Sequence, residues 1–553
     1  MNLFGRSVLA VHDGASFARD VERLLWHTGF SSVTNVDGAG DQGADIVADR
    51  GGKRWVFQCK FKSSGAVGED AIEEVVRGLQ AYGASCAAVV TNATFTRGAE
   101  EAQDRTAKLT GVEVKLVNGS LLEKLWSDSE CANRYSQHEL RPYQASAFSA
   151  VRHDLKVHGR ALLVLATGLG KTVVAGSCVE WVYSEQPNAR VLVVAHAKEL
   201  VEQLERAMWR HLPKSCPTQL LTGDSRPVLL DGLTCATIQS GLAYVREGYR
   251  PDFIVVDEAH HVGADSQFSE LLALCAGARV LGVTATPWRG DGFNVEDVFG
   301  PASFKVGIEE GMRLGFLCDV DYRVFADNVD WNFVQQQSRQ GYSIAELNSR
   351  LFLPQRDEQI RDRLLDAWMK TVQPRGIVFC QSIEHAERMR GLLQRVGMWS
   401  SAGIIHGGLP RRARQVALMN FRSGSSPILV AVDVLNEGVD VPDVNVVCFA
   451  RVTHSRRIFI QQLGRGLRVS AGKDQVVVLD FISDLRRVAC LLKLKRQIAT
   501  DSDVVHLPSS HKIEFEDLRV EGLMMEWMKD AADLDTASDQ AKLDFPDLGD
   551  VRD

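Results

Sequence analysis

The chain has 553 residues, of which 45% are apolar and 24% charged, an ordinary composition for a soluble globular protein. No apolar run approaches the ~18 residues of a membrane span, and the first residues lack the apolar core of a signal peptide, so we expect a cytoplasmic protein without a membrane partner. The net charge of −8 gives no overall basic surface, although a local basic groove can bind nucleic acid on an acidic protein. The eleven cysteines form no Cys-x-x-Cys pair or Cys/His cluster, which argues against a zinc knuckle or an iron–sulfur cluster.

Residues 16–127 alternate helix-like and strand-like segments. The first helix is expected over 16–30, where Ser16 is the capping residue and apolar residues recur at helical spacing. Two strands joined by a Gly51–Gly52 turn are expected over 44–61. The order continues as helix, strand, helix and strand over 70–84, 87–91, 99–111 and 112–117. This pattern predicts a mixed α/β domain.

From residue 138 onward, short apolar runs alternate with helix-like segments, which indicates parallel sheets covered on both faces. The runs form two groups, and the stretch between them lacks this rhythm. The expected division of the chain is an α/β domain over 1–127, a polar linker over 128–137, a parallel-sheet domain over 138–303, a connecting segment over 304–372, a second parallel-sheet domain over 373–484, and a helical segment with an acidic tail over 485–553.

The C-terminal region contains a basic stretch and, further along, an acidic one. Residues 484–497 are basic with apolar residues at helical spacing, so they could follow DNA phosphates or form an ordinary packed helix. From Lys529 to Asp553 there are eight Asp and three Lys or Arg, which predicts a disordered, solubilising tail. An alternative is that the tail mimics DNA and occupies a basic groove.

A glycine-rich loop, "ATGLGKT", follows the strand "ALLVLA". Backbone N–H groups of such a loop cradle phosphates at a helix N-terminus, where Lys171 would contact the β and γ phosphates of ATP and Thr172 would bind Mg²⁺. The general pattern has glycine where this chain has Leu165, so a simple glycine-rich turn is the alternative. The candidate ATP ligands in this loop are Thr167, Gly168, Gly170, Lys171 and Thr172.

Two further motifs suit ATP hydrolysis. "VVDEAH" ends an apolar strand; Asp257 can bind Mg²⁺ and Glu258 can activate the attacking water. The alternative is an acidic helix N-terminus favoured by the helix dipole. "QQLGRGLR" places Arg465 and Arg468 three residues apart, so both can act as arginine fingers on the γ-phosphate or form a solvated basic face.

Taken in order, the motifs of 138–484 resemble those of superfamily 2 helicases and translocases, especially RadD-type repair helicases and the motors of restriction enzymes. The motifs are "LRPYQ", "ATGLGKT", "VVAHAKELVEQ", "ATIQS", "DEAH", "TATP", "VFCQSIEHAE", "IIHGG", "EGVDVP" and "QQLGRGLR". The resemblance implies two RecA-like domains that close on ATP and bind DNA mainly through phosphates. It also implies nucleotide contacts at Arg141, Gln144 (to adenine), Gly438 and Asp440. Two departures are Val432, where many members have threonine, and the missing zinc-binding tail.

The first domain carries a possible metal site. Asp45 begins the strand that precedes "WVFQCKF", and the Gly51–Gly52 hairpin brings it alongside Gln58 and Lys60. A carboxylate and an amide oxygen can hold Mg²⁺. A lysine beside the metal can orient or deprotonate water, or stabilise charge on a phosphate. The alternative is a polar strand face with Gln and Lys by chance.

Residues 16–127 also resemble the Mrr-type restriction endonuclease domain, which has the PD-(D/E)xK nuclease fold. The resemblance rests on "FARDVERLL", "GDQGADIVA", "WVFQCKF" and "QAYGASCAAVVTNATFT". It implies that Asp45, Gln58 and Lys60 are the catalytic residues. Many relatives have an acidic residue where this chain has Ala18; Glu22, one turn further on, either replaces it or is a surface residue.

These motifs predict an ATP-driven DNA translocase or helicase with a Mg²⁺-dependent endonuclease on one chain, suited to restriction or defence against phage. One alternative is a DNA-repair helicase or remodeller whose first domain only binds DNA. Another is an RNA helicase, since DEAH boxes also occur there. Further partner subunits, encoded elsewhere, are compatible with the sequence.

Overall fold

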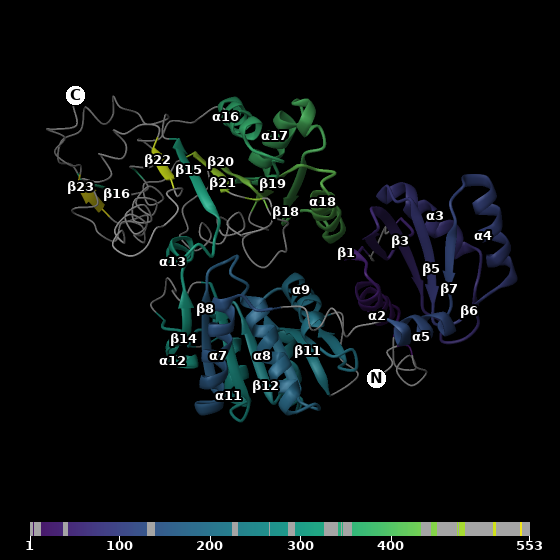
Figure 1. Cartoon of the computed structure of the whole chain (residues 1–553), viewed down its shortest axis with the longest axis horizontal. Helices are drawn as coiled ribbons and strands as arrows, with labels where there is room; N and C mark the ends of the chain where they lie inside the picture. Colours follow the sequence, from purple (N-terminus) through teal and green to yellow (C-terminus); the bar gives the residue numbers. More distant parts are fainter. Residues whose placement is uncertain are drawn as a thin grey trace.

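The computed structural model describes residues 4, 13–36, 42–129, 139–223, 231–264, 266–285, 293–325, 341–343, 346, 357–432, 444–450, 473, 475–481, 512–515 and 542–544. These residues form three large sheets with helices on their faces (Figure 1). We call the part built on the first sheet the N-terminal domain, and the parts built on the other two lobe 1 and lobe 2. All three parts are α/β, as the sequence predicts.

The N-terminal domain contains a mixed sheet of order β1-β2-β3-β5-β7. Its first three strands are antiparallel, and β3, β5 and β7 are parallel. The strands are β1 (Ser31–Asn35), β2 (Ile46–Arg50), β3 (Lys53–Lys60), β5 (Cys86–Thr91) and β7 (Val114–Val117), with a short pair β4 (Ala66–Val67) and β6 (Thr94–Phe95). The helices are α2 (Gly14–His27), α3 (Asp70–Tyr82), α4 (Arg97–Thr110) and α5 (Gly119–Asp128).

Two local features of this domain follow from single residues. The predicted hairpin is confirmed: Arg50 pairs with Lys53, and Gly51 and Gly52 have φ of +59° and +73°, which glycine adopts without strain. The predicted cap is wrong, because α2 begins at Gly14 and its N-cap is Asp13. The Asp13 carboxylate accepts a hydrogen bond from the Ser16 backbone N–H at 2.8 Å.

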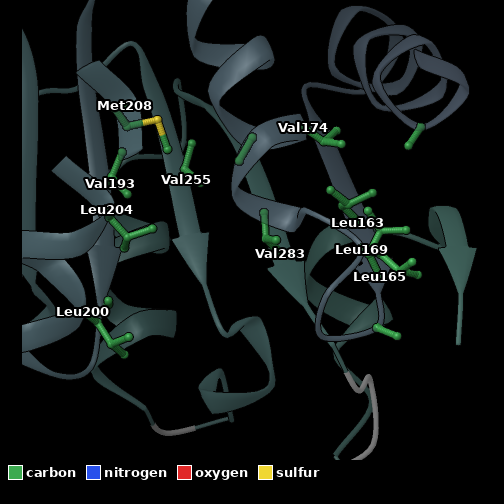
Figure 2. Close-up of a cluster of buried hydrophobic side chains, with 14 of the residues drawn as sticks. Leu163, Leu165, Leu169, Val174, Val193, Leu200, Leu204, Met208, Val255 and Val283 are labelled. Carbon is green, nitrogen blue, oxygen red and sulfur yellow. The ribbon is translucent and has the colours of Figure 1, made fainter. Parts of the chain in front are cut away.

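Lobe 1 contains a seven-stranded parallel sheet of order β10-β11-β9-β12-β13-β8-β14. The strands are β8 (Arg160–Leu165), β9 (Arg190–Ala195), β10 (Thr218–Leu221), β11 (Gly232–Thr237), β12 (Phe253–Asp257), β13 (Arg279–Thr284) and β14 (Ala302–Val306). The helices are α7 (Pro142–Val157), α8 (Lys171–Glu185), α9 (Lys198–Met208), α10 (Ile238–Arg246), α11 (Gln267–Leu274), α12 (Glu296–Phe299) and α13 (Ile308–Arg313), with 3-10 turns η1 (Trp209–His211) and η2 (Ala259–His261). The glycine-rich loop rests on this lobe's apolar core, with Leu163, Leu165 and Leu169 beside Val174 (Figure 2).

Lobe 2 contains a second seven-stranded parallel sheet, of order β18-β19-β17-β20-β21-β15-β22. The strands are β15 (Asp319–Phe325), β17 (Gly376–Cys380), β18 (Gly403–His406), β19 (Ile428–Val432), β20 (Val446–Ala450), β21 (Gln475–Phe481) and β22 (Lys512–Phe515). The helices are α16 (Asp357–Lys370), α17 (Ile383–Leu393) and α18 (Arg411–Ser423), with a 3-10 turn η3 (Gly397–Trp399).

Two segments of lobe 2 differ from the sequence interpretation. β15 lies in the stretch interpreted as a connecting segment, yet it pairs in parallel with β21 and β22. Within the tail for which composition predicts disorder, β23 (Lys542–Asp544) forms an antiparallel pair with β16 (Gly341–Ser343). Backbone pairing does not require the apolar composition on which the sequence interpretation depended.

The N-terminal domain contacts lobe 1 through charged side chains of α2. Arg23 is 2% exposed and donates a hydrogen bond to the backbone carbonyl of Cys216 at 3.0 Å. Glu22 is 1% exposed and pairs with Arg206 of α9. Glu22 is therefore not a surface residue, and its carboxylate is engaged with lobe 1.

Aromatic side chains surround these buried charges. Trp126 of α5 lies under the Lys214 ammonium at 4.7 Å and is also near the Arg23 guanidinium, at 5.8 Å. Trp26 contacts Trp209, with ring centroids 6.4 Å apart. Cation–π contacts of this kind are strongest where water is excluded. The interface with lobe 1 is thus both charged and desolvated.

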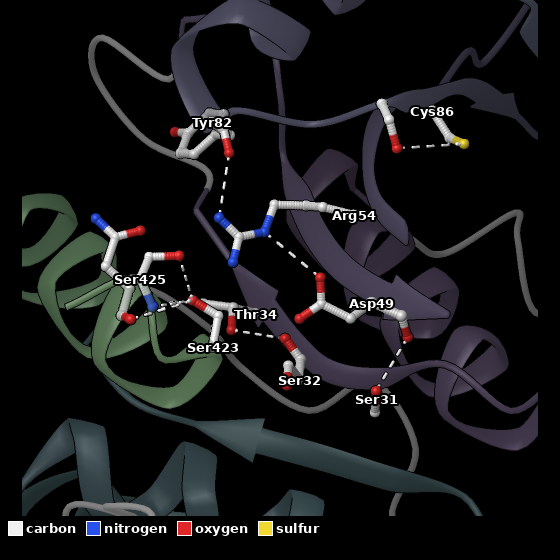
Figure 3. A network of polar contacts seen from close by, with 11 residues as sticks. Ser31, Ser32, Thr34, Asp49, Arg54, Tyr82, Cys86, Ser423 and Ser425 are labelled. Atoms are coloured by element: carbon white, nitrogen blue, oxygen red, sulfur yellow. Dashed lines mark hydrogen bonds and ion pairs between the residues drawn. The ribbon is translucent and has the colours of Figure 1, made fainter. Parts of the chain in front are cut away.

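Helix α18 of lobe 2 packs against the N-terminal domain. Met419 is 3% exposed and packs in the apolar cluster of the N-terminal domain. Arg412 donates a hydrogen bond to the Tyr82 hydroxyl at 3.0 Å and lies over its ring. Arg414 pairs with Glu199 of α9 at 2.8 Å, so α18 contacts lobe 1 as well. Figure 3 shows the end of this helix beside β1.

Candidate functional site

The glycine-rich loop joins β8 to the N-terminus of α8, as the sequence predicts for a phosphate-binding loop. Gly168 and Gly170 have φ of +96° and +83°, a conformation that other residues rarely adopt. Behind the loop, Gln144 is 7% exposed and its amide donates to the Leu169 carbonyl at 3.0 Å. A Cβ on Gly170 would lie 2.5 Å from the Gln144 amide nitrogen. The structure thus places Gln144 as a support for the loop's backbone.

The base of this loop is also bounded by residues of "LRPYQ". The Arg141 backbone N–H donates to the Gln144 amide oxygen at 3.0 Å, and the Tyr143 hydroxyl donates to the Leu169 carbonyl at 3.1 Å. The Tyr143 ring stacks on Phe316, with centroids 4.3 Å apart. Phe316 follows α13 in the stretch that leads to lobe 2, and sequence reasoning gave it no role.

The "DEAH" residues converge on the same loop. The Lys171 ammonium and the Glu258 carboxylate are 3.9 Å apart, and both side chains are about one-tenth exposed, 11% and 8%. Glu258 has a left-handed backbone, with φ of +49°, directly after β12. Burial raises the pKa of the Asp257 carboxyl above its usual range, and the Glu258 charge adds to this rise while Lys171 opposes it. Clustered buried charges with a shifted pKa are typical of catalytic sites.

His260 connects the Lys171–Glu258 cluster to the neighbouring strand, β13. The Nδ1 atom of His260 is 3.2 Å from a Glu258 carboxylate oxygen and 3.0 Å from the Thr284 hydroxyl at the end of β13. The "DEAH" and "TATP" motifs are therefore in direct contact. Thr167, Gly168, Gly170, Lys171 and Thr172 lie together at the start of α8. The remaining predicted nucleotide contacts, Gly438, Asp440, Arg465 and Arg468, lie outside the described residues.

The structure also brings Asp45 and Gln58 together, with Lys60 two residues further along β3. Ile46 pairs with Phe57 across the hairpin, and the Asp45 backbone N–H donates to the Phe57 carbonyl at 2.8 Å, so Asp45 lies opposite Gln58. The Asp45 carboxylate accepts from the Cys59 backbone N–H at 2.6 Å. Asp45 and Gln58 are 6% and 4% exposed.

These residues fit a divalent cation. The Gln58 amide oxygen is buried and has no hydrogen-bond partner within the described structure, which is costly unless a ligand occupies it. In the described parts of the chain, no three His, Cys, Asp or Glu side chains gather as a metal site made from these residues alone would require. A cation at this point would therefore be held by the Asp45 carboxylate and the Gln58 amide, completed by backbone carbonyls and water.

One neighbouring carboxylate escaped the sequence reasoning. Glu74 of α3 lies with its Oε2 atom 2.5 Å from the Lys60 ammonium. It follows Glu73 in the helix, and nothing in the sequence distinguishes the two. Only the packing of α3 on β3 identifies which of them reaches the site.

Three family matches cover most of the chain. Residues 9–126 match "Restriction endonuclease" (Mrr_cat), 137–289 match "Type III restriction enzyme, res subunit" (ResIII), and 359–470 match "Helicase conserved C-terminal domain". The chain joins an Mrr-type restriction endonuclease domain to a superfamily 2 helicase. We therefore call the N-terminal domain the nuclease domain and the two lobes the helicase lobes. Members of these families generally use ATP and a divalent metal, and helicases and restriction enzymes bind DNA.

Relatives of known name fall into the same classes. A protein of Schizosaccharomyces pombe named as a mitochondrial ATP-dependent helicase, irc3, is 27% identical over 68% of this chain and 62% of its own length. The type I restriction enzyme EcoAI endonuclease subunit of Escherichia coli is 26% identical over 58% of this chain and 43% of its own. The chain thus spans less than two thirds of the length of these relatives.

The fold is also similar to that of a solved restriction enzyme. The ATP-dependent Type ISP restriction-modification enzyme LlaBIII bound to DNA superposes with a TM-score of 0.51 and 17% identity, over 96% of this chain and 42% of that one. At this identity the likeness shows a similar fold. Among the described residues, no helix combines the length and the apolar character needed to cross a bilayer.

Proposed function

We propose that the protein is an ATP-driven DNA translocase or helicase with its own Mg²⁺-dependent endonuclease, acting in restriction or defence against phage. The observation that carries this proposal is the presence of two separate clusters on one chain. One contains Lys171 and Glu258 at the glycine-rich loop, and the other contains Asp45, Gln58 and Lys60 in the nuclease domain. DNA is the substrate that both clusters would share.

In the helicase cluster, the start of α8 would bind the ATP phosphates, with Lys171 on the β and γ phosphates. Glu258 would accept a proton from the attacking water, and the His260 Nδ1 atom lies 3.2 Å from this carboxylate. Mg²⁺, when bound by Thr172 and Asp257, would neutralise phosphate charge. Arg465 and Arg468 remain our candidates for arginine fingers from lobe 2.

In the nuclease cluster, Asp45 and Gln58 would hold a Mg²⁺ ion, which supplies Lewis-acid chemistry at the scissile phosphate. Lys60 would stabilise negative charge on that phosphate. The domain division of the sequence interpretation is part of this proposal: residues 1–127 cut, and residues 138–484 consume ATP. Because the clusters belong to different domains, each is expected to tolerate loss of the other.

A reciprocal pair of variants tests the proposal. Lys171→Ala is expected to reduce DNA-stimulated ATP hydrolysis by at least about 100-fold, because it removes a charge that acts on the γ-phosphate. Asp45→Ala is expected to abolish nicking of supercoiled plasmid by Mg²⁺-loaded protein and to leave ATP hydrolysis nearly unchanged. Stimulation by RNA in place of DNA would contradict the DNA assignment. Wild-type protein that never nicks would favour a remodeller whose first domain only binds DNA.

A further inference from the structure

Strand β3 presents alternate side chains to two different helices. Val56 packs in the apolar cluster that contains Val75 of α3, whereas Phe57 packs in the cluster that contains α2. Successive side chains of a strand point to opposite faces, so Gln58 and Lys60 lie on the face covered by α3. Figure 1 shows α3 beside β3 and β5.

Glu74 reaches this face from α3. Its carboxylate is 2.5 Å from the Lys60 ammonium, and the two side chains are 27% and 26% exposed. The backbone of the same helical turn is pressed against Gly43, two residues before Asp45. A Cβ on Gly43 would lie 1.9 Å from the Glu74 carbonyl oxygen, and Gly43 has φ of +85°, so only glycine fits there. The turn of α3 that contains Glu74 thus packs against the segment that leads into Asp45, and it also contacts Lys60.

Neither Ala18 nor Glu22 of helix α2 supplies a carboxylate to Lys60. Ala18 is buried, and Glu22 is engaged with Arg206 of lobe 1. The main apolar contacts of α2 are on the other face of β3, away from Gln58 and Lys60. The acidic group that contacts the nuclease lysine therefore comes from α3.

We propose that Glu74 is a positioning residue of the nuclease site, which holds the Lys60 ammonium beside Asp45 and Gln58. The inference rests on the proposed nuclease function. Lysine is a point charge on a flexible four-carbon stem, so holding it removes rotamer freedom before DNA arrives. A charge that is already in place stabilises the phosphate transition state without reorganisation. Glu74 thus supports Lys60 as a fixed positive charge rather than as a base.

Chemical labelling tests the contact without metal, DNA or catalysis. Lys60 of the full-length protein is expected to react with acetic anhydride about threefold faster in Glu74→Gln than in wild type, the size expected for a partly exposed ion pair. Mass spectrometry gives the rate for each lysine, so the other lysines are internal standards. Glu73→Gln is the matched control, because Glu73 is exposed on the same helix. Equal Lys60 labelling in wild type and Glu74→Gln would overturn the proposal.

Plasmid cleavage tests whether the Glu74–Lys60 contact matters for cutting DNA. Glu74→Gln is expected to lower kcat about tenfold with little change in KM for DNA, and to leave ATP hydrolysis unchanged. In a double-mutant cycle, Glu74→Gln should have no further effect once Lys60→Ala is present, whereas a general loss of structure would add to it. Full rescue of Glu74→Gln by excess Mn²⁺ would overturn the proposal, since it would make Glu74 a cation ligand. Wild-type protein that labels as expected but never cuts would refute the nuclease function and, with it, the proposed positioning role of Glu74 in cleavage.

Discussion

The nuclease domain contacts the two helicase lobes in different ways. Toward lobe 1, α2 buries the charged Arg23 and Glu22 among aromatic rings. Toward lobe 2, helix α18 makes contacts through Met419 and a hydrogen bond from Arg412. Buried charges are costly to separate from their partners, whereas one amphipathic helix can be displaced more readily. We therefore expect the nuclease domain to behave as one body with lobe 1 and to part from lobe 2 first.

Arg23→Ala should have the largest effect, because it leaves a cavity and a buried Cys216 carbonyl without its donor. We expect a loss of about 3 kcal/mol of interface stability. Calorimetry should show the joint unfolding of the nuclease domain and lobe 1 split into two transitions, the first at lower temperature. Arg97→Ala is the control, since that side chain is 91% exposed and pairs with Glu101 of the same helix, α4. If Arg23→Ala melts like Arg97→Ala, then Arg23 does not hold the nuclease domain to lobe 1.

Glu22→Gln keeps the size of the side chain at the lobe 1 contact but removes its charge. Burial raises the pKa of the Glu22 carboxyl, although Arg206 lowers it. A raised folded-state pKa means that this group's contribution to stability is complete below the unfolded value and is lost as pH rises through the folded value. Glutamine does not titrate, so the stability of wild type relative to Glu22→Gln should be greatest at low pH, where the carboxyl is protonated in both states, and should fall as pH rises through the raised folded-state pKa. Thermal unfolding at several pH values measures this, and a difference that grows with pH would contradict it.

Arg412→Ala should have the smallest effect. It removes a hydrogen bond and a cation–π contact to Tyr82 at a partly exposed position, worth less than about 1 kcal/mol. A double-mutant cycle with Tyr82→Phe isolates the hydrogen bond from the ring contact. Destabilisation as large as that of Arg23→Ala would show that the two interfaces are equivalent after all.

Much of the helicase fold is predictable because its central strands are buried on both faces. Strands β8, β12 and β17 are continuous apolar runs, which the sequence reveals directly. β15 is not predictable in this way, because it alternates apolar and charged residues. Asp321 and Arg323 lie two apart on it and pair with each other at 2.6 Å.

The residues of the candidate sites and of the domain interface also differ in how well the sequence reveals them. Lys171, Glu258 and the Asp45–Gln58–Lys60 group lie in compact motifs, so sequence alone singles them out. Arg23 and Glu22 resemble the solvent-facing charges of any amphipathic helix, because the Arg23 acceptor is 193 residues away. Contacts of that separation depend on how domains pack, which local periodicity does not encode.

The place of β15 in the sheet decides where lobe 2 can be cut out of the gene. β15 lies between β21 and β22, and α16, the first described helix of lobe 2, begins at Asp357. A fragment started at Asp357 would lack β15, and β21, whose residues Val476 and Val478 are 0% exposed, would become an open apolar edge. Such an edge recruits strands from neighbouring molecules, so the fragment would aggregate on expression. A fragment started ahead of Asp319 keeps that edge covered.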